Sequence, residues 1–256
     1  MIIDPSDTSE NSAACGGMIR PDDTGLTLCI VGCGYVGLVS GACLAALGHA
    51  VVCIDTDETR IRVLKEGGCP IYEPGLTNLI GGCVAAGRLS FDTDARKYAR
   101  MSDAIFLAVG TPARRGGGHA DLRFLNAAVD DIVDVVPKGS VIVTKSTVPV
   151  GTNADLQARL DRMRGDAVGE GGPSMVSNPE FLREGSAIED FMQPDRIVAG
   201  FRDGDNAGRE ILRRIYAPLT RSGYPLMETD TASAEMVKYA SNAFLAVKIA
   251  YTNQIS

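Results

Sequence analysis

A glycine-rich turn between an apolar run and a helical segment most strongly constrains the fold of this chain. Its glycines, Gly32, Gly34 and Gly37, form a G-x-G-x-x-G pattern after the apolar run 26–31 and before the helix-like segment 35–47. In this context the first glycine permits a tight turn, and the second lets a pyrophosphate approach the backbone. The third allows close helix–strand packing, and the helix N-terminus faces the phosphate charge. The pattern therefore predicts a dinucleotide-binding unit.

An acidic residue closes the next apolar run, which spans residues 50–54. This residue, Asp55, stands where a carboxylate accepts hydrogen bonds from an adenosine ribose. The same carboxylate would repel a 2′-phosphate, so the pattern favours NAD over NADP. Arg60, one helical turn further on, is a candidate for the same ribose or phosphate edge. The alternative for Arg60 is an ordinary solvated charge on a helix.

Apolar runs alternate with helical segments along the rest of the chain. Strands are predicted at residues 26–31, 50–54, 104–109, 141–144, 174–177 and 196–199. Helices are predicted at residues 35–47, 58–66, 121–136, 153–164, 206–216 (before Pro218) and 231–256. Because the strands are almost continuously apolar, this order indicates a Rossmann-like, doubly wound α/β fold. Its mostly parallel sheet would be covered by helices on both faces and followed by a long helix.

The expected organisation is a flexible tail, one large domain and part of a helix. We expect the tail over residues 1–26, an NAD-binding domain over 27–229 and the start of a long central helix over 230–256. Residues 231–256 contain no glycine or proline, and apolar residues recur through them at helical spacing. This stripe has no obvious partner in the chain, which indicates a piece of something larger.

The charge balance argues against nucleic acid or a membrane as the main partner. The chain of 256 residues has 25 Lys+Arg and 32 Asp+Glu, a net charge of −7, whereas both partners prefer a basic surface. It has no tryptophan, and aromatic residues make up only 5%, so a base-stacking surface is not expected. The most apolar stretch, residues 38–54, is interrupted by polar residues and is not expected to span a membrane.

The cysteines and histidines favour structural roles. The seven cysteines are Cys15, Cys29, Cys33, Cys43, Cys53, Cys69 and Cys83, and no pair has C-x-x-C spacing. With only two histidines, His49 and His119, a metal site is not expected. Free thiols in apolar runs indicate a reducing compartment and predict a cytoplasmic protein. Both histidines are expected to be structural or solvated rather than general bases.

Seven motifs, in order, resemble the UDP-glucose/GDP-mannose dehydrogenase family. They are Gly32–Leu38, Glu73–Leu76, Val109–Pro112, Ser146–Thr152, Asn178–Gly185, Pro194–Val198 and Glu235–Phe244. The resemblance covers the chain from about residue 27 to its end. It implies oxidation of the C6 hydroxyl of a nucleotide sugar to a carboxylate by two NAD molecules in succession, through an aldehyde and a cysteine thioester. The motifs 146–152 and 194–198 look most like those of members that convert UDP-glucose to UDP-glucuronate. GDP-mannose and UDP-N-acetylmannosamine remain alternative substrates.

The resemblance also implies roles on the cofactor side. Tyr35 and Val36 would lie at the pyrophosphate, with Val36 contacting it through its backbone. Thr111 and Thr147, each predicted to end a strand, would line the nicotinamide half, and Thr147 would help to hold a catalytic water. Taken alone, each threonine is more typical of a residue that caps the following turn or helix.

The segment 178–185 carries two acidic residues, Glu180 and Glu184. A proline is expected to lead into a short helical turn, on which positions i and i+4 share a face. By resemblance, Glu180 is the candidate general base and Glu184 the cofactor-side residue. Phe181 and Leu182 would border the sugar nucleotide. The alternative is a solvated helix start with ordinary acidic residues.

Lys238 and Asn242 stand four residues apart on the long predicted helix and so point the same way. An ammonium and an amide can both stabilise developing negative charge on oxygen. By resemblance these two residues would act at C6, and Lys238 would receive or position the hydroxyl proton. Without the motif, such a pair is more typical of a solvated surface.

The nucleophilic cysteine of the family lies downstream of this helix, and none of the cysteines present matches it. We therefore expect this chain to bind NAD without completing the oxidation. A non-catalytic, truncated NAD-binding module is the alternative. The family resemblance also implies a homodimer through the helix 230–256, and its unmatched apolar stripe provides a physical reason.

Overall fold

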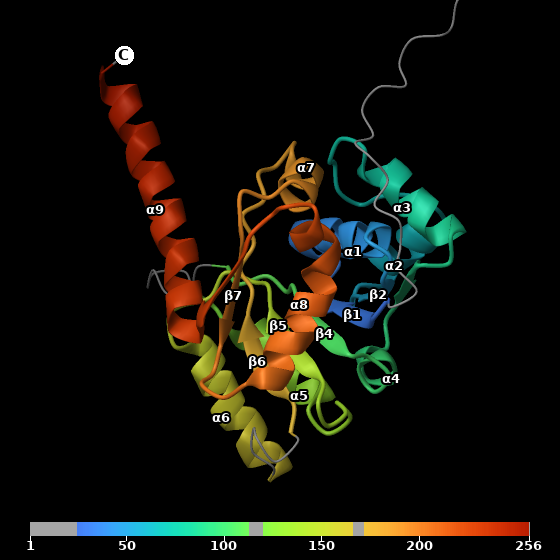
Figure 1. Cartoon of the computed structure of the whole chain (residues 1–256). Helices are drawn as coiled ribbons and strands as arrows, with labels where there is room; N and C mark the ends of the chain where they lie inside the picture. The colour runs from blue at the N-terminus through green and yellow to red at the C-terminus, as the bar shows by residue number, and fades with distance from the viewer. Residues whose placement is uncertain (1–24, 113–119, 166–171, 256) are drawn as a thin grey trace, which may run out of the picture.

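The computed structural model describes residues 25–112, 120–165 and 172–255, and its strands form one eight-stranded sheet (Figure 1). The strands are β1 (Thr27–Val31), β2 (Ala50–Ile54), β3 (Leu89–Asp92), β4 (Ala104–Leu107), β5 (Val141–Thr144), β6 (Ser174–Ser177), β7 (Ile197–Phe201) and β8 (Leu226–Asp230). The helices are α1 (Tyr35–Ala46), α2 (Glu58–Lys65), α3 (Leu76–Ala85), α4 (Ala95–Ala99), α5 (Arg123–Ile132), α6 (Thr152–Arg164), α7 (Ala187–Met192), α8 (Asn206–Arg221) and α9 (Thr231–Ile255). His119 and residues 1–24 of the predicted tail lie outside the described residues.

The sheet confirms the predicted doubly wound α/β fold. Its strand order is β3-β2-β1-β4-β5-β6-β7-β8. Neighbouring strands are parallel except at β6–β7, where a single antiparallel pairing joins Ser177 to Gly200. The chain moves outward from β1 to β3 and then returns to place β4 on the other side of β1. The strand order therefore reverses between β1 and β4, and open α/β sheets bind ligands at the carboxyl ends of the strands at such a reversal.

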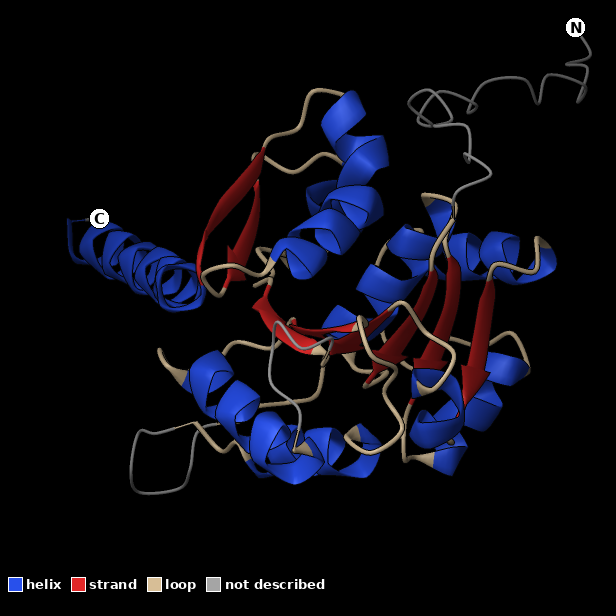
Figure 2. Ribbon diagram, turned by 60° about the horizontal axis from the view of Figure 1, so that its bottom comes forward, coloured by secondary structure: helices blue, strands red, loops and turns tan. Residues whose placement is uncertain are grey.

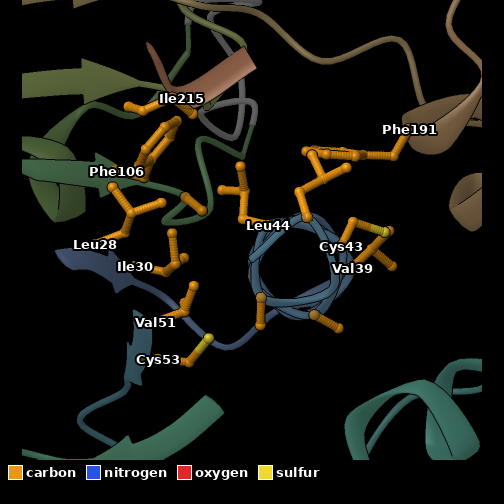
Figure 3. Packing of buried hydrophobic residues seen from close by; sticks show 14 of the residues in the cluster. Leu28, Ile30, Val39, Cys43, Leu44, Val51, Cys53, Phe106, Phe191 and Ile215 are labelled. Atoms are coloured by element: carbon orange, nitrogen blue, oxygen red, sulfur yellow. The ribbon is translucent and has the colours of Figure 1, made fainter. Parts of the chain in front are cut away.

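Side chains alternate between two apolar layers along the central strands. Leu28 and Ile30 of β1 face the layer built by α1, α2, α3, α7 and α8. Cys29 and Val31 face the layer built by α4, α5 and α6. Figure 3 shows the first layer, in which Leu44 of α1 packs beside strand residues. Burial of both faces explains why the central strands are apolar at most positions.

Helix α8 extends past the predicted boundary. The prediction ended this helix at Tyr216 because Pro218 lacks the N–H that a helix interior needs. The structure continues α8 to Arg221 with Pro218 inside it, so that boundary is wrong. Ile215, Tyr216 and Leu219 are all buried, and their packing onto the sheet holds the last turn in place.

The final helix, α9, runs away from the sheet and leaves its second half exposed (Figures 1 and 2). Only Ala234, Glu235 and Lys238 of this helix are buried. Glu235 fixes the start of α9 by accepting hydrogen bonds at 2.6 Å from the Gly151 N–H and at 2.8 Å from the Asn153 N–H. Within the described residues, no helix is long and apolar enough to cross a membrane.

Candidate functional site

The glycine turn at the end of β1 leaves one open approach to the backbone. A Cβ on Gly37 would lie 1.8 Å from the Gly32 oxygen, so α1 packs directly against the turn. Gly32 has a φ of +108°, and a Cβ there would lie 2.6 Å from the oxygen of Ala108 on the loop after β4. A Cβ on Gly34, by contrast, would meet nothing within 4 Å. The open space lies at the glycine that the motif reserves for the pyrophosphate, so the turn fits a dinucleotide.

Asp55 faces this turn from the end of β2. Its Oδ2 accepts hydrogen bonds from the Cys33 N–H at 2.8 Å and from Arg60 Nη1 at 2.9 Å. Its Oδ1 accepts the Asp57 N–H at 3.0 Å. The carboxylate is thus held beside the glycine turn, where a ribose would lie. Arg60 is paired with it instead of extending as an isolated charge into solvent.

Glu73 links the glycine turn to the segment 178–185. This buried carboxylate accepts the Tyr35 hydroxyl and, at 2.8 Å each, the N–H groups of Gly185 and Ala187. Burial opposes ionisation of Glu73, but these donors outweigh it and lower its pKa. Burial and the hydrogen bond to Glu73 raise the pKa of Tyr35 to about 12. Glu73 begins one of the seven family motifs, but the sequence did not predict that it links the glycine turn to the segment 178–185.

The two predicted threonines meet at the same edge of the sheet. The Thr111 hydroxyl donates to the Thr147 carbonyl at 2.7 Å. Both residues lie in loops beyond the ends of β4 and β5, not at the strand ends. Ser146 adds a second tie by donating to the Val109 carbonyl at 2.6 Å. These hydrogen bonds hold together the loops that follow β4 and β5.

A cavity of about 500 Å³ opens where the segment 178–185 meets α9. It brings together five residues predicted from the sequence: Glu180, Phe181, Leu182, Lys238 and Asn242. Lys238 and Asn242 line it as predicted for neighbours one turn apart on a helix. Thr147 and Glu184 are not among its lining residues.

An ion pair lies in the wall of this cavity. Lys238 Nζ lies 2.8 Å from Glu180 Oε1, and the two side chains are only 8% and 12% exposed. Glu180 Oε2 accepts the Leu182 N–H at 2.7 Å. Lys238 Nζ also lies 5.4 Å from the centre of the Phe181 ring, with the Arg196 guanidinium carbon 5.2 Å from the same ring. A carboxylate and an ammonium, the groups needed for proton transfer and for stabilising charge on oxygen, thus share one site.

The predicted helical turn over residues 180–184 is wrong. The backbone there is irregular, and α7 begins only at Ala187. Side chains take the N–H groups that a helix would use, because the Arg183 N–H donates to Asp190 Oδ2 at 2.7 Å and the Leu182 N–H donates to Glu180. Glu184 is therefore exposed and does not share a helical face with Glu180.

The sequence reading missed Lys145, which follows β5 and lines the cavity although it is buried. Its Nζ donates to Asn178 Oδ1 at 3.1 Å and to the Tyr216 oxygen at 3.4 Å. Burial lowers its pKa to about 8, partly offset by the charge of Glu180. The signal in the sequence was a lysine directly after the predicted strand 141–144 and one residue before the motif 146–152.

His49 is a structural residue, as predicted. Its Nδ1 accepts the Leu26 N–H at 3.2 Å, and its Nε2 lies 2.9 Å from the Ile215 carbonyl oxygen. Burial lowers its pKa, which favours the neutral form of the ring. The cysteines of the described segments are free: Cys29, Cys33, Cys43, Cys53, Cys69 and Cys83. Those segments contain no group of His, Cys, Asp and Glu residues able to hold a metal ion.

Comparison with known families gives two matches that together span most of the chain. Residues 26–220 match the NAD binding domain of the UDP-glucose/GDP-mannose dehydrogenase family. Residues 232–256 match the central domain of the same family. NAD is therefore the cofactor of the domain that carries the glycine turn and Asp55.

Similar curated proteins carry a common name. A UDP-glucose 6-dehydrogenase of Rhizobium meliloti is 49% identical over 231 residues, which is 90% of this chain and 52% of that protein. A UDP-glucose 6-dehydrogenase of Bacillus subtilis is 45% identical over 90% of this chain and 50% of its own length. The chain thus spans about half the length of the curated relatives it matches.

Solved structures share the fold. A UDP-glucose dehydrogenase from Pyrobaculum islandicum superposes with a TM-score of 0.83 at 40% identity, covering 93% of this chain and 54% of that one. A GDP-mannose dehydrogenase from Pseudomonas aeruginosa gives a TM-score of 0.82 at 34% identity, covering 88% of this chain and 51% of that one.

Proposed function

The chain belongs to the UDP-glucose/GDP-mannose dehydrogenase family, and from this premise we propose that it is the NAD-binding half of an enzyme that oxidises UDP-glucose to UDP-glucuronate. The single observation that carries the proposal is the Glu180–Lys238 ion pair in the cavity between the NAD-binding domain and α9. The relatives named UDP-glucose 6-dehydrogenase support the choice of sugar.

On the cofactor side, residues of this chain bind and orient NAD. Gly34 leaves room for the pyrophosphate at the start of α1, and Asp55 accepts hydrogen bonds from the ribose. Tyr35 and Val36 lie at the pyrophosphate, Arg60 steadies Asp55, and Thr111 and Thr147 border the nicotinamide half. The bound nicotinamide supplies the hydride acceptor.

On the substrate side, Phe181 and Leu182 border the sugar nucleotide, and Lys238 and Asn242 act at the C6 oxygen. Lys238 receives or positions the hydroxyl proton in the first oxidation and stabilises charge on the oxygen in the second. Glu180 handles protons through a water held with the help of Thr147. Glu184 lies on the cofactor side of the segment 178–185 and contacts the cofactor.

The complete reaction consumes one water and two NAD⁺ and yields a carboxylate, two NADH and three protons. Of the five hydrogens involved, two leave C6 as hydrides, one leaves the hydroxyl and two come from water. The family resemblance implies that a cysteine thioester forms after the aldehyde. That nucleophile would come from the half of the relatives that this chain does not span, so we expect these 256 residues to bind NAD without completing the oxidation.

The decisive test is the initial rate of NADH formation by the full-length protein with a panel of nucleotide sugars. Oxidation of UDP-glucose in preference to GDP-mannose and UDP-N-acetylmannosamine is the expected result. The Pseudomonas aeruginosa structure keeps GDP-mannose in the panel, and preference for it would change the substrate assignment. Steady NADH production from UDP-glucose by these 256 residues alone would contradict the expectation that they bind NAD without completing the oxidation.

A second candidate function is that of a non-catalytic NAD-binding module. The observation behind it is that the match covers only 52% of the Rhizobium meliloti relative. A gene that stops after Ser256 would support it, whereas a reading frame that continues into a cysteine motif supports the enzyme.

We further propose that α9 pairs with α9 of a second copy. Its exposed apolar residues include Phe244, Leu245, Val247, Ile249 and Tyr251, which would be costly to leave in water. A homodimer in light scattering is expected, and a monodisperse monomer of the full-length protein would contradict it. The free thiols support a reducing, cytoplasmic location.

A further inference from the structure

Lys145 is a cationic side chain enclosed by the protein at the edge of the cavity. It directly follows β5, is 5% exposed and lines the same cavity as Glu180 and Lys238. An ammonium removed from water destabilises a fold unless hydrogen bonds and opposite charge compensate it. Its partners therefore indicate what it does there.

The hydrogen bonds of Lys145 converge on Asn178. Lys145 Nζ and the Tyr216 hydroxyl both donate to Asn178 Oδ1, at 3.1 Å and 2.5 Å. Asn178 Nδ2 donates in turn to the Val198 carbonyl at 2.7 Å. One amide thus connects the end of β5, helix α8 and strand β7. Because Glu180 stands two residues after Asn178, this network fixes the point from which Glu180 enters the cavity.

Charged and titratable groups face Lys145 from every side. Glu180 contributes the opposite charge, Lys238 on α9 contributes a like charge, and Cys43 on α1 and Tyr216 on α8 complete the surroundings. The Phe191 ring of α7 lies 5.5 Å from Nζ. Burial lowers the pKa of Lys145 to about 8, while Glu180 raises it and Lys238 lowers it.

We infer that Lys145 is a positioning residue for the proposed oxidation. Its ammonium anchors Asn178, and through it Glu180, and places a second positive charge near the carboxylate that Lys238 already contacts. This inference rests on the proposed function, because it assigns Lys145 a task only where Glu180 takes part in proton transfer. Loss of the Lys145 proton removes a charge and a hydrogen-bond donor from this network.

The test compares Lys145→Met with Tyr216→Phe in the full-length protein. Both changes remove a donor to Asn178 Oδ1, but only the first removes a charge. We would measure kcat and KM for NAD reduction by UDP-glucose between about pH 6.5 and pH 10. Wild type should lose kcat as pH rises through about 8. Lys145→Met should lower kcat about ten- to a hundredfold with little change in KM, and should abolish that alkaline fall.

Tyr216→Phe should keep the alkaline fall at the wild-type pH, whatever its absolute rate. A Lys145→Met profile parallel to that of wild type would overturn the inference. So would a Tyr216→Phe variant whose profile changes in the same way as that of Lys145→Met. A wild-type protein that oxidises none of the nucleotide sugars would overturn the proposed function, and this inference with it.

A second measurement does not depend on either variant folding. In wild-type protein labelled with ¹³C at lysine Cε, NMR titration should show one lysine with a pKa near 8. Addition of UDP-glucose without NAD should shift that titration, because the sugar nucleotide contacts Glu180 and Lys238 beside it. The inference would be contradicted if every lysine titrated near the ordinary pKa of 10.5. It would also be contradicted if UDP-glucose left the titration unchanged in a protein that oxidises UDP-glucose.

Discussion

Lys238 and Glu180 form an ion pair at 2.8 Å that ties α9 to the segment 178–185. Neither side chain is more than 12% exposed, so each charge depends on the other for compensation. The contact places the proposed general base and the proposed oxyanion-stabilising group in one cavity before any substrate enters. It also makes the start of α9 part of the site.

Removing this ammonium should impair the reaction but not cofactor binding. For Lys238→Met in the full-length protein we expect kcat to fall at least about a hundredfold, because charge on the C6 oxygen loses its partner. The NAD dissociation constant, measured by calorimetry, should change less than about twofold, since the glycine turn is untouched. Lys65→Met, an exposed lysine on α2, is the matched control. Wild-type kcat in Lys238→Met would remove Lys238 from the mechanism.

The glycine turn allows binding to be separated from folding. Gly34→Ala adds a methyl group where nothing lies within 4 Å, so the melting temperature should hold while NAD affinity falls about tenfold or more. Gly37→Ala places its Cβ 1.8 Å from the Gly32 oxygen and should lower the melting temperature by many degrees. Thermal melts and NAD titrations of this chain check both. An unaltered NAD affinity in Gly34→Ala would mean that the pyrophosphate lies elsewhere.

Asp55 should set the preference for NAD over NADP. Asp55→Asn keeps the shape of the side chain but removes the charge that repels a 2′-phosphate and pairs with Arg60. We expect NAD affinity to fall about tenfold and NADP affinity to rise, because Arg60 becomes available to a phosphate. Binding constants for both cofactors give the ratio. An unchanged ratio would show that another group selects the cofactor.

Glu235 should contribute to stability rather than to chemistry. It is 2% exposed and accepts hydrogen bonds from the N–H groups of Gly151 and Asn153 and from Asn153 Nδ2, so it caps α6 from α9. Glu235→Ala leaves these donors buried and should cost about 3 kcal/mol in urea unfolding. Glu58→Ala, at an exposed position of α2, should cost less than about 1 kcal/mol. Equal losses in the two variants would argue against the cap.

The buried Lys145 predicts how stability depends on pH. Its pKa of about 8 in the folded chain lies below the ordinary value of 10.5, so between these values the unfolded chain binds more protons. The free energy of unfolding should therefore rise with pH across this window, and the penalty for burying the charged form is fully present below about pH 8. Urea unfolding of wild type and Lys145→Met at pH 7 and pH 10 measures the difference. If the free energy of unfolding changed with pH equally in both proteins, groups other than Lys145 would cause the change.

The cofactor half of the site was largely predictable because its requirements are local. Gly32, Gly34 and Gly37 meet backbone demands that adjacent residues impose, and Asp55 follows directly from the end of a buried strand. The apolar runs identified the six inner strands because both faces of the sheet are covered. Strands β3 and β8 escaped prediction because they lie at the edges, where exposed positions break the apolar pattern.

For the proposed substrate half, the sequence pointed to residues that the structure places around one cavity, but it did not predict their geometry. Resemblance identified Glu180 and Lys238, yet the pattern predicted a helical turn where side chains take the backbone N–H groups instead. Likewise, Pro218 signalled a helix end that packing of Tyr216 and Leu219 overrode. Ordinary helix propensities differ by less than about 1 kcal/mol per residue, and a proline inside a helix costs about 3 kcal/mol. Burial of several large apolar side chains outweighs both.

The sequence by itself determined a doubly wound fold, a glycine turn of the dinucleotide-binding type and an acidic residue at the end of the next strand, because strand, turn and helix signals act between neighbours in the chain. Only the tertiary structure decided that Lys145, Asn178 and Tyr216 share one polar network, and that Glu73 ties the glycine turn to Gly185. These contacts join residues that are far apart in the sequence. Their strength comes from exclusion of water, a condition that exists only once the layers have packed.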